Sequence, residues 1–402
     1  MIPELRKSFN DRWSPEKYES LLGGIAARAG TSVPFRCSET PVFLPPDLLS
    51  TTVRYGRELY GQLAENPDYR AASDVAIPNQ FRVPNEPEHP LFVQADFGLV
   101  RDSNDKLEPK LVEIQGFPSI YAFQFALGEA YREAYKLDEF EGGPISHLLD
   151  GLSSDSFTEL LARVIVGEHE PQEVVLLEID PYEQKTLPDF LLTQQMLGIR
   201  IASLTEVKRK GRELFLDGKP IRRIYNRVIA DELVAKKIQS PFDFRDDLDV
   251  EWAGHPNWFF RLSKFSIPWF RHPSVPRTWF LHEFRELPDD LSQYVLKPLF
   301  SFAGQGVIIG PTQAQIDAIP PSERAHYILQ EKMDFIPTVN TPAGATKVEI
   351  RVMYIHHRGE MRAVTTVIRT GRGKMMGVDF NKNLDWVGAS AGFYLSSALA
   401  GP

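Results

Sequence analysis

The amino-acid sequence predicts a mixed α/β (α+β) fold, because its segments differ in hydrophobic periodicity. Residues 14–28 and 46–66 carry apolar side chains at helical spacing. Residues 174–203 alternate between strand and helix patterns, which is typical of a βαβ unit in a parallel sheet. From Tyr294 onward, short strand patterns dominate. A chain of 402 residues is long enough for two or three domains with cores of their own.

The composition narrows the choice of compartment and partner. Apolar residues make up 43% and charged residues 25%, as in ordinary globular proteins. The net charge is −9 and no basic run exceeds Lys208–Lys210, so we expect no nucleic-acid partner. No stretch approaches 18 uninterrupted apolar residues, so we expect no membrane association. Cys37 is the only cysteine, which excludes an intramolecular disulfide and a thiolate metal cluster and predicts a cytoplasmic protein.

The first elements are a pair of helices and a hairpin. Ser14 followed by Pro15 reads as a helix cap and first turn, and Pro46 opens the second helix. The runs Leu91–Leu99 and Lys110–Ile114 read as strands joined by a polar turn over 101–105. A further helix is expected from Ser119 to about Lys136.

A βαβ unit and a second hairpin are expected next. Val174–Ile179 reads as a strand, Leu187–Leu197 as a helix that Gly198 ends, and Ile199–Ser203 as a strand. The turn Asp217-Gly218 then predicts a hairpin between two strands, which are Glu213–Leu216 and Pro220–Val228.

Aromatic side chains crowd the segment 252–284, where two interpretations remain open. Aromatics beside arginines could stack on bases, but the acidic net charge favours a packed connection between domains. Five strands are expected after it, at 294–299, 305–309, 327–333, 346–356 and 361–369.

The stretch Tyr294–Gly306 carries the strongest chemical signal. Lys297 lies at the end of a predicted strand, and a loop with Gly304 and Gly306 follows. A lysine ammonium and glycine-rich backbone both suit phosphate oxygens, although such loops are more often plain turns. Neither a Walker P-loop nor a complete dinucleotide fingerprint occurs, so the pattern indicates another kind of triphosphate site.

A magnesium site is predicted on the first hairpin. Glu113 and Gln115 share one face of their strand, and Asp96 can lie on the same face if the two strands pair. Carboxylate and amide oxygens suit Mg²⁺ beside a triphosphate. The alternative is two ordinary exposed acids, but Glu113 stands between Val112 and Ile114, where an unpaired carboxylate is costly.

Two further patterns fit a nucleotide site. In Ile328–Met333, Glu331 and backbone groups could bind adenine and ribose while Met333 gives apolar contact. Glu349 and Arg351 share one strand face, with Arg369 on the next strand, which suits neutralisation of a transferred phosphoryl group. An ordinary surface ion pair would explain the second pattern equally well.

The order of these motifs resembles the ATP-grasp superfamily. It runs without a break over about 256–370, as Lys264, Val275-Pro276-Arg277-Thr278, Leu296-Lys297-Pro298, the glycine loop, Gln330-Glu331-Lys332 and Glu349-x-Arg351. The metal-binding pattern of Asp96 and Glu113 comes before these motifs instead of after them. That order is similar to the circularly permuted branch, which includes eukaryotic-type glutathione synthetase and glutathionylspermidine synthase.

The resemblance implies three domains and a set of site residues. Residues 1–150 would hold N-terminal helices and the metal-binding strands, 151–250 an inserted Rossmann-like substrate domain, and 251–402 the nucleotide-binding region. ATP would be bound by Lys264, Lys297, Gly304, Gln305, Gly306, Gln330, Glu331, Lys332, Met333 and Glu349. Mg²⁺ would be bound by Asp96, Glu113 and Gln115, the reacting groups by Arg351 and Arg369, and substrate by Ser119, Tyr121 and Arg227.

The activity implied is an ATP- and Mg²⁺-dependent carboxylate–amine or carboxylate–thiol ligase that forms an acyl phosphate. Its substrates would be small molecules or peptides, and a homodimer remains open. A phosphotransferase and a non-catalytic ATP-binding scaffold are the alternatives. Glutathione synthetase would have Asn at Gln115, an acid near Ser301 and Arg near Gln94, and a serine-rich segment at Gly116–Ser119. Glutathione is therefore not the expected product.

Overall fold

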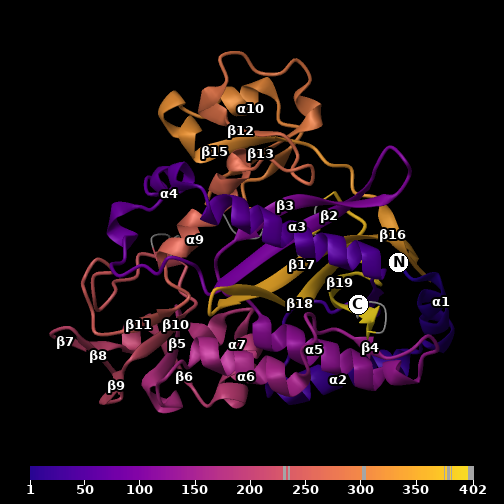
Figure 1. The fold of residues 1–402 in the computed structure, drawn as a ribbon, viewed down its shortest axis with the longest axis horizontal. Coiled ribbons are helices and arrows are strands. Elements are labelled where there is room, and N and C mark those ends of the chain that lie inside the picture. The colour runs from indigo at the N-terminus through magenta and orange to yellow at the C-terminus, as the bar shows by residue number, and fades with distance from the viewer. Residues whose placement is uncertain are drawn as a thin grey trace.

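A computed structural model describes residues 1–229, 232–233, 236–300, 305–374, 376–377, 381 and 383–396. It is a mixed α/β structure with several sheets, as predicted. Figure 1 shows a small sheet region at the top, a long central sheet in the middle and a layer of helices below. Within the described residues, none of the helices has the length and apolar character needed to cross a membrane.

The central sheet joins strands from both ends of the chain. Its eight strands include the path β1-β19-β18-β17-β2-β3, with β16 paired to β17 and β4 paired to β19. The bounds are β1 Val42–Phe43, β2 Phe92–Arg101, β3 Leu107–Gln115, β4 Ile145–Ser146, β16 Pro337–Thr341, β17 Gly344–His357, β18 Glu360–Gly371 and β19 Gly388–Leu395. The predicted hairpin is confirmed as β2 and β3, and β17 lies beside β2. Segments that the sequence separates by more than two hundred residues thus share one surface.

Helices cover both faces of this sheet. The helices that the structure describes are α1 Pro3–Arg12, α2 Pro15–Ala29, α3 Pro46–Ala64, α4 Pro67–Ser73, α5 Tyr121–Ala134, α6 Ser154–Ile165, α7 Leu187–Leu197, α9 Asn257–Arg261 and α10 Gln313–Asp317. Helix α10 packs on the small sheet instead. The predicted cap of α2 is confirmed, because the Ser14 side chain accepts the backbone N–H of Lys17. Helix α3 packs on one face against apolar residues such as Val93, Ile350 and Val352. Helices α5 and α6 pack against apolar residues that include Met353 and Ile355.

The contact between α3 and the central sheet depends on a glycine. A Cβ atom at Gly56 would lie 2.1 Å from the Tyr354 hydroxyl, which donates a hydrogen bond to the Val53 carbonyl at 2.8 Å. Alanine is favoured over glycine in a helix by about 1 kcal/mol, but overpacking costs about 1–3 kcal/mol. We therefore expect Gly56→Ala to lower the free energy of unfolding, measured by urea denaturation.

The same helix offers a matched control for that substitution. A Cβ atom at Gly61 would meet nothing within 4 Å, so Gly61→Ala should add only the helical preference. We expect Gly61→Ala to raise the free energy of unfolding by up to about 1 kcal/mol. If both variants change stability in the same direction, the close approach of Tyr354 does not limit the packing of α3.

A four-stranded parallel sheet holds the predicted βαβ unit. Its order is β11-β10-β5-β6, with β5 Val174–Glu178, β6 Arg200–Ser203, β10 Arg223–Asn226 and β11 Glu251–Ala253. Strands β5 and β6 are parallel and α7 connects them, so the βαβ prediction is confirmed. The chain leaves β5 toward β6 on one side and returns to β10 on the other. The carboxyl ends of β5 and β10 therefore mark a topological switch point.

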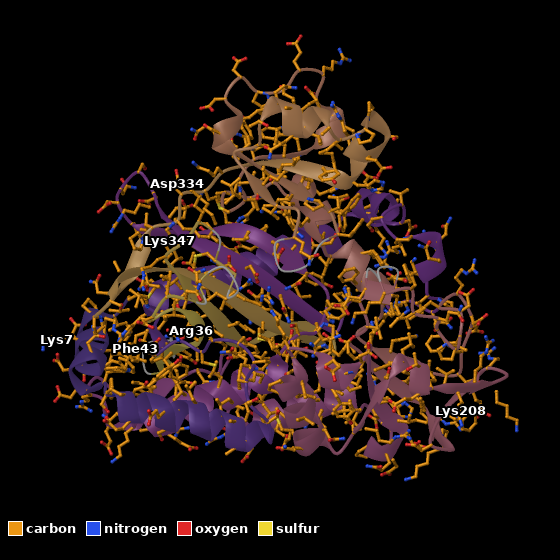
Figure 2. The ribbon with its side chains drawn as sticks, turned by 180° about the vertical axis from the view of Figure 1, so that it is seen from behind. Lys7, Arg36, Phe43, Lys208, Asp334 and Lys347 are labelled. Carbon is orange, nitrogen blue, oxygen red and sulfur yellow. The ribbon has the colours of Figure 1, made fainter. Side chains whose placement is uncertain are left out.

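The second predicted hairpin is correct at its turn and wrong in the length of one strand. Strands β7 Lys208–Lys210, β8 Glu213–Leu216 and β9 Lys219–Ile221 form a separate three-stranded sheet. The strand predicted over Pro220–Val228 is divided between β9 and β10, because the chain leaves the hairpin after Ile221 and pairs again with β5. The three side chains of β7 are exposed, and Lys208 lies at the outer edge of the molecule (Figure 2).

The small sheet carries the lysine that the sequence singled out. Its order is β12-β15-β13-β14, with β12 Thr278–Phe280, β13 Tyr294–Pro298, β14 Ile308–Ile309 and β15 Tyr327–Glu331. The strand predicted over 305–309 covers only its last two residues, because only Ile308 and Ile309 pair with β13. In the preceding aromatic segment Trp258, Phe260 and Phe265 are buried, as the packing interpretation predicts.

Candidate functional site

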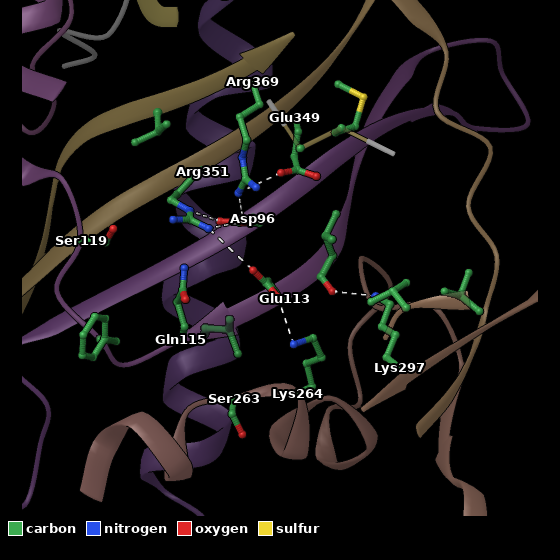
Figure 3. Close-up of a pocket in the computed structure, with 18 of the residues that line it drawn as sticks. Asp96, Glu113, Gln115, Ser119, Ser263, Lys264, Lys297, Glu349, Arg351 and Arg369 are labelled. Carbon is green, nitrogen blue, oxygen red and sulfur yellow. Dashed lines mark hydrogen bonds and ion pairs between the residues drawn. The ribbon is translucent and has the colours of Figure 1, made fainter. Parts of the chain in front are cut away.

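A cavity of about 940 Å³ lies where the central sheet, the small sheet and the ends of the parallel strands meet. It contains most of the residues that the sequence predicted for a site. Those lining it are Asp96, Glu113, Gln115, Ser119, Arg227, Lys264, Lys297, Gln330, Glu331, Lys332, Met333, Glu349, Arg351 and Arg369. Figure 3 shows ten of the lining residues with labels, nearly all of them charged or amide side chains.

Three of the predicted residues lie elsewhere and one is not described. Gln305 and Gly306 are described but are not part of the cavity lining. Tyr121, expected to contact substrate, is buried instead, and its hydroxyl donates to the Tyr354 carbonyl at 2.8 Å. Gly304 lies outside the described residues, as does Ser301, where the sequence lacks the acid expected of glutathione synthetase.

Strand register explains why the charged residues gather on one face of the central sheet. Asp96 on β2 lies directly opposite Glu113 on β3 and opposite Arg351 on β17. Glu349 on β17 lies opposite Arg369 on β18. Residues that are directly opposite in a sheet point to the same side, so these five side chains form one cluster.

Two arginines close around the carboxylate of Asp96. Arg351 donates two parallel hydrogen bonds to it, Nε to Oδ1 at 2.6 Å and Nη2 to Oδ2 at 2.7 Å, and Arg369 donates to Oδ2 as well. The side chain of Asp96 is 1% exposed. Burial alone would raise the pKa of this carboxyl, but the two guanidinium groups outweigh it and the pKa is lowered. Asp96 is thus a buried anion whose two oxygens are both occupied.

Glu113 is the more open acid of the cluster. Its side chain is 27% exposed, and its carboxylate lies 3.8 Å from the Lys264 ammonium and 3.7 Å from the Arg351 guanidinium. Lys264 begins a short 3₁₀ helix, Lys264–Trp269, which packs beside β3. At such distances the ion pairs are loose, so a ligand can compete for both partners.

Glu349 is the third acid and sits deeper. It forms an ion pair with Arg369 at 2.9 Å and is 5% exposed. Burial raises the pKa of Glu349 to about 7, Arg369 opposes that rise, and the charges of Asp96 and Glu113 add to it. Together with Lys264, and with Lys297 from the small sheet, the described residues of this cluster comprise four cationic side chains and three carboxyl groups.

Lys297 reaches the same space from the small sheet. Its ammonium donates to the Gln330 side-chain oxygen at 2.6 Å and to the Val112 carbonyl on β3 at 3.2 Å. Burial lowers the pKa of Lys297 to about 8, which Glu113 partly opposes and Lys264 reinforces. Beside it the cavity wall is apolar, with Val295, Ile309 and Met333 among its lining residues.

The other end of the cavity lies at the switch point of the parallel sheet, where Arg227 follows β10. Arg227 is 3% exposed and forms an ion pair with Asp189 at 2.6 Å. Glu178, the last residue of β5, also lines this end, and burial raises its pKa to about 8. The sequence interpretation missed Glu178. The available signal was an acid that ends an otherwise apolar strand in a βαβ unit.

Among the described residues, no group of three or more His, Cys, Asp or Glu side chains is arranged to hold a metal ion. Glu113 is the most open carboxylate of the cluster around Asp96, with Gln115 on the same strand face. Such a site can bind an anion together with a cation, but it does not enclose a metal by itself.

Comparison with solved structures relates this architecture to a known one. A glutathione synthetase-like effector (GSS30) from Globodera pallida, in its apo form, matches with a TM-score of 0.59. The match covers 94% of this chain and 96% of that chain at 13% sequence identity. The fold resembles that of this effector. No protein-family model and no curated protein sequence matches this chain.

Proposed function

We propose that this protein is an ATP- and Mg²⁺-dependent ligase that joins a carboxylate to an amine or thiol. The observation that carries the proposal is the meeting of Lys297, Lys264 and Glu113 with Arg351 and Arg369 in one cavity. Its fold would be a circularly permuted ATP-grasp fold, because the strands with Asp96 and Glu113 precede the small sheet in the chain.

The nucleotide would lie between the small sheet and the central sheet. Lys264 and Lys297 would bind the phosphates, since both are cationic side chains that line the cavity and the printed partners of the Lys297 ammonium are neutral oxygens. The adenine ring would pack on Val295, Ile309 and Met333, next to the polar end of β15. This position leaves the arginine pair facing the terminal phosphate.

A magnesium ion fits the acids only in part. Glu113 would hold it, because Mg²⁺ beside a triphosphate needs only one or two carboxylates, whereas the Gln115 amide faces the guanidinium of Arg351. Asp96 does not fit as a ligand while its oxygens accept from two arginines. When bound, the ion would neutralise charge on the phosphate oxygens.

The chemical steps need positioning and charge neutralisation more than a general base. A substrate carboxylate oxygen attacks the terminal phosphorus, ADP leaves, and an acyl phosphate forms. Arg351 and Arg369 would stabilise the charge that develops on the transferred group. An amine or thiol then attacks the acyl carbon and expels phosphate.

Substrate would occupy the end of the cavity at the switch point. Arg227 and Glu178 place a guanidinium and a carboxyl group there, and Ser119 also lines the cavity. Burial limits the space to a small molecule or one end of a peptide. The Arg227 guanidinium pairs with Asp189, and burial raises the pKa of Glu178 to about 8, so at neutral pH these two side chains offer N–H and O–H donors to a polar or anionic substrate group.

The purified full chain tests the proposal by calorimetry and by ADP release. We expect ATP to bind more tightly with Mg²⁺ than without it, and ADP to form with pooled amino acids, peptides and polyamines. ATP binding without ADP in any pool would favour the scaffold, and a phosphorylated product that persists would favour a phosphotransferase. Absence of nucleotide binding would make the proposal wrong.

The pH dependence of binding follows from the buried lysine. Lys297, with its pKa lowered to about 8, is charged below that pH and neutral above it. ATP affinity should therefore fall above pH 8, by about tenfold per pH unit if binding requires the proton. Calorimetry on either side of pH 8 measures this slope. If ATP affinity falls equally steeply with pH in Lys297→Met, the titrating group is not Lys297.

A further inference from the structure

Among the described residues, the Lys297 ammonium has two hydrogen-bond partners, both neutral oxygens. A lysine ammonium has three N–H donors and accepts nothing. One of them goes to the Val112 carbonyl at 3.2 Å and one to the Gln330 side-chain oxygen at 2.6 Å. The third donor has no partner among the residues that the structure describes, and Lys297 lines the cavity.

Gln330 is itself held in one orientation. Its amide nitrogen donates to the Thr278 hydroxyl at 3.0 Å, and that hydroxyl donates to the Pro276 carbonyl at 2.8 Å. The Thr278 oxygen has given its only proton away, so toward Gln330 it can only accept. This fixes the nitrogen of the amide toward Thr278 and its oxygen toward Lys297. Gln330 is 1% exposed, and β12 and β15 hold it directly opposite Thr278.

We propose that Gln330 is a positioning residue, which Thr278 orients so that it aims the remaining N–H of Lys297 at an anionic ligand in the cavity. Gln330 thus acts through Lys297. This role differs from the sequence prediction, which placed Gln330 among the residues that bind ATP directly. That the ligand is the triphosphate of ATP rests on the proposed function. A neutral partner matters because a carboxylate at this position would cancel the charge that attracts phosphate.

Three substitutions separate the elements of this arrangement. Gln330→Met keeps the shape and removes the acceptor, Gln330→Glu keeps the acceptor and adds a negative charge, and Thr278→Val removes the group that orients the amide. A hydrogen bond to a charged group is worth about 1.5–3 kcal/mol, so Gln330→Met should weaken Mg·ATP binding by about tenfold to a hundredfold. Gln330→Glu should weaken it as well, and Thr278→Val less than either.

A double-mutant cycle with Lys297→Met identifies the route of the effect. In the Lys297→Met background, we expect Gln330→Met to change the ATP Kd by less than about twofold. An equal loss in both backgrounds would mean that Gln330 binds the nucleotide directly, and would overturn the proposal. Gln313→Met, on the exposed helix α10 of the same region, controls for a general effect of the substitution.

A measurement without nucleotide keeps this inference separate from the proposed function. A buried, hydrogen-bonded ammonium exchanges its protons slowly, so Lys297 should give a side-chain NH₃⁺ signal in NMR, assigned by its loss in Lys297→Met. We expect Gln330→Met to remove the signal and Gln330→Glu to retain it. If the wild type binds no ATP but the signal follows this pattern, the positioning role stands and the ATP assignment fails. A signal that Gln330→Met leaves unchanged in a folded protein overturns the positioning role.

Discussion

Replacing Lys297 by methionine is expected to weaken Mg·ATP binding by about 30-fold or more. The ammonium is buried and faces the cavity, and removing one charged partner of a buried polar contact costs about 2–5 kcal/mol. Methionine has nearly the same length and leaves an apolar group between β13 and β15, so the small sheet should remain folded. Calorimetric titration of ATP into both proteins measures the change.

A lysine of the first hairpin serves as the matched control. Lys106 is exposed in the turn between β2 and β3, so Lys106→Met changes the net charge equally without touching the cavity. We expect its ATP affinity to match the wild type. ATP binding that is the same in Lys297→Met, Lys106→Met and wild type would remove Lys297 from the nucleotide site.

The variant Glu113→Gln tests the predicted Mg²⁺ ligand, as Lys297→Met tests the predicted phosphate ligand. If Glu113 holds Mg²⁺, the variant should bind ATP about equally well with and without the ion, whereas Lys297→Met should weaken both. A Mg²⁺ response that survives Glu113→Gln would place the ion elsewhere.

The second large effect is on stability. Asp96→Asn should lower the free energy of unfolding by about 3–5 kcal/mol, because it removes a buried anion that two partly buried guanidinium groups share. Urea denaturation at neutral pH, without metal or nucleotide, measures it. Asp105→Asn is the control, since the ion pair of Asp105 with Arg101 lies on the surface and is worth at most about 1 kcal/mol.

The pH dependence of this difference has a defined sign. The pKa of Asp96 is lower in the folded protein than the ordinary value of 3.8, so its contribution is fully present above that pH and is lost as the pH falls below it. The gap between wild type and Asp96→Asn should therefore narrow in acid. If Asp96→Asn leaves stability unchanged and weakens Mg²⁺ binding instead, Asp96 is a metal ligand as the sequence pattern suggested.

The sequence could predict those elements that depend on local periodicity and on turn and cap residues. The hairpin of β2 and β3, the cap at Ser14 and the parallel pair around α7 all follow from patterns within about thirty residues. Helix α6 is absent from the predicted elements although Ser153 caps it, so that signal was available. Strand β19 consists largely of small residues, Gly388-Ala-Ser-Ala-Gly392, which have little strand preference, and its pairing with β18, β1 and β4 makes it a strand.

The site could be predicted as a set of residues but not as a set of partners. Alternation placed Glu113 and Gln115 on one face of their own strand, and Glu349 and Arg351 on one face of theirs. Nothing in the sequence indicates that β17 pairs with β2, so the closure of Arg351 around Asp96 could not be foreseen. Without that pairing, Asp96 was predicted to be a metal ligand, whereas in the structure its carboxylate accepts hydrogen bonds from two arginines.

The pairing of β2 with β17 also has a consequence for how the chain folds. Asp96 and Arg351 are separated by 255 positions, and Asp96 and Arg369 by 273, so the anion is made long before its cations during synthesis. Contacts of such long range form slowly, because a large loop must close first. Before β17 and β18 are synthesised and pair, the Asp96 carboxylate lacks its arginine partners and is more stable in water. The edge of β2 that later pairs with β17 is then unpaired. This unpaired edge is where we expect an incompletely made chain to aggregate or to need a chaperone.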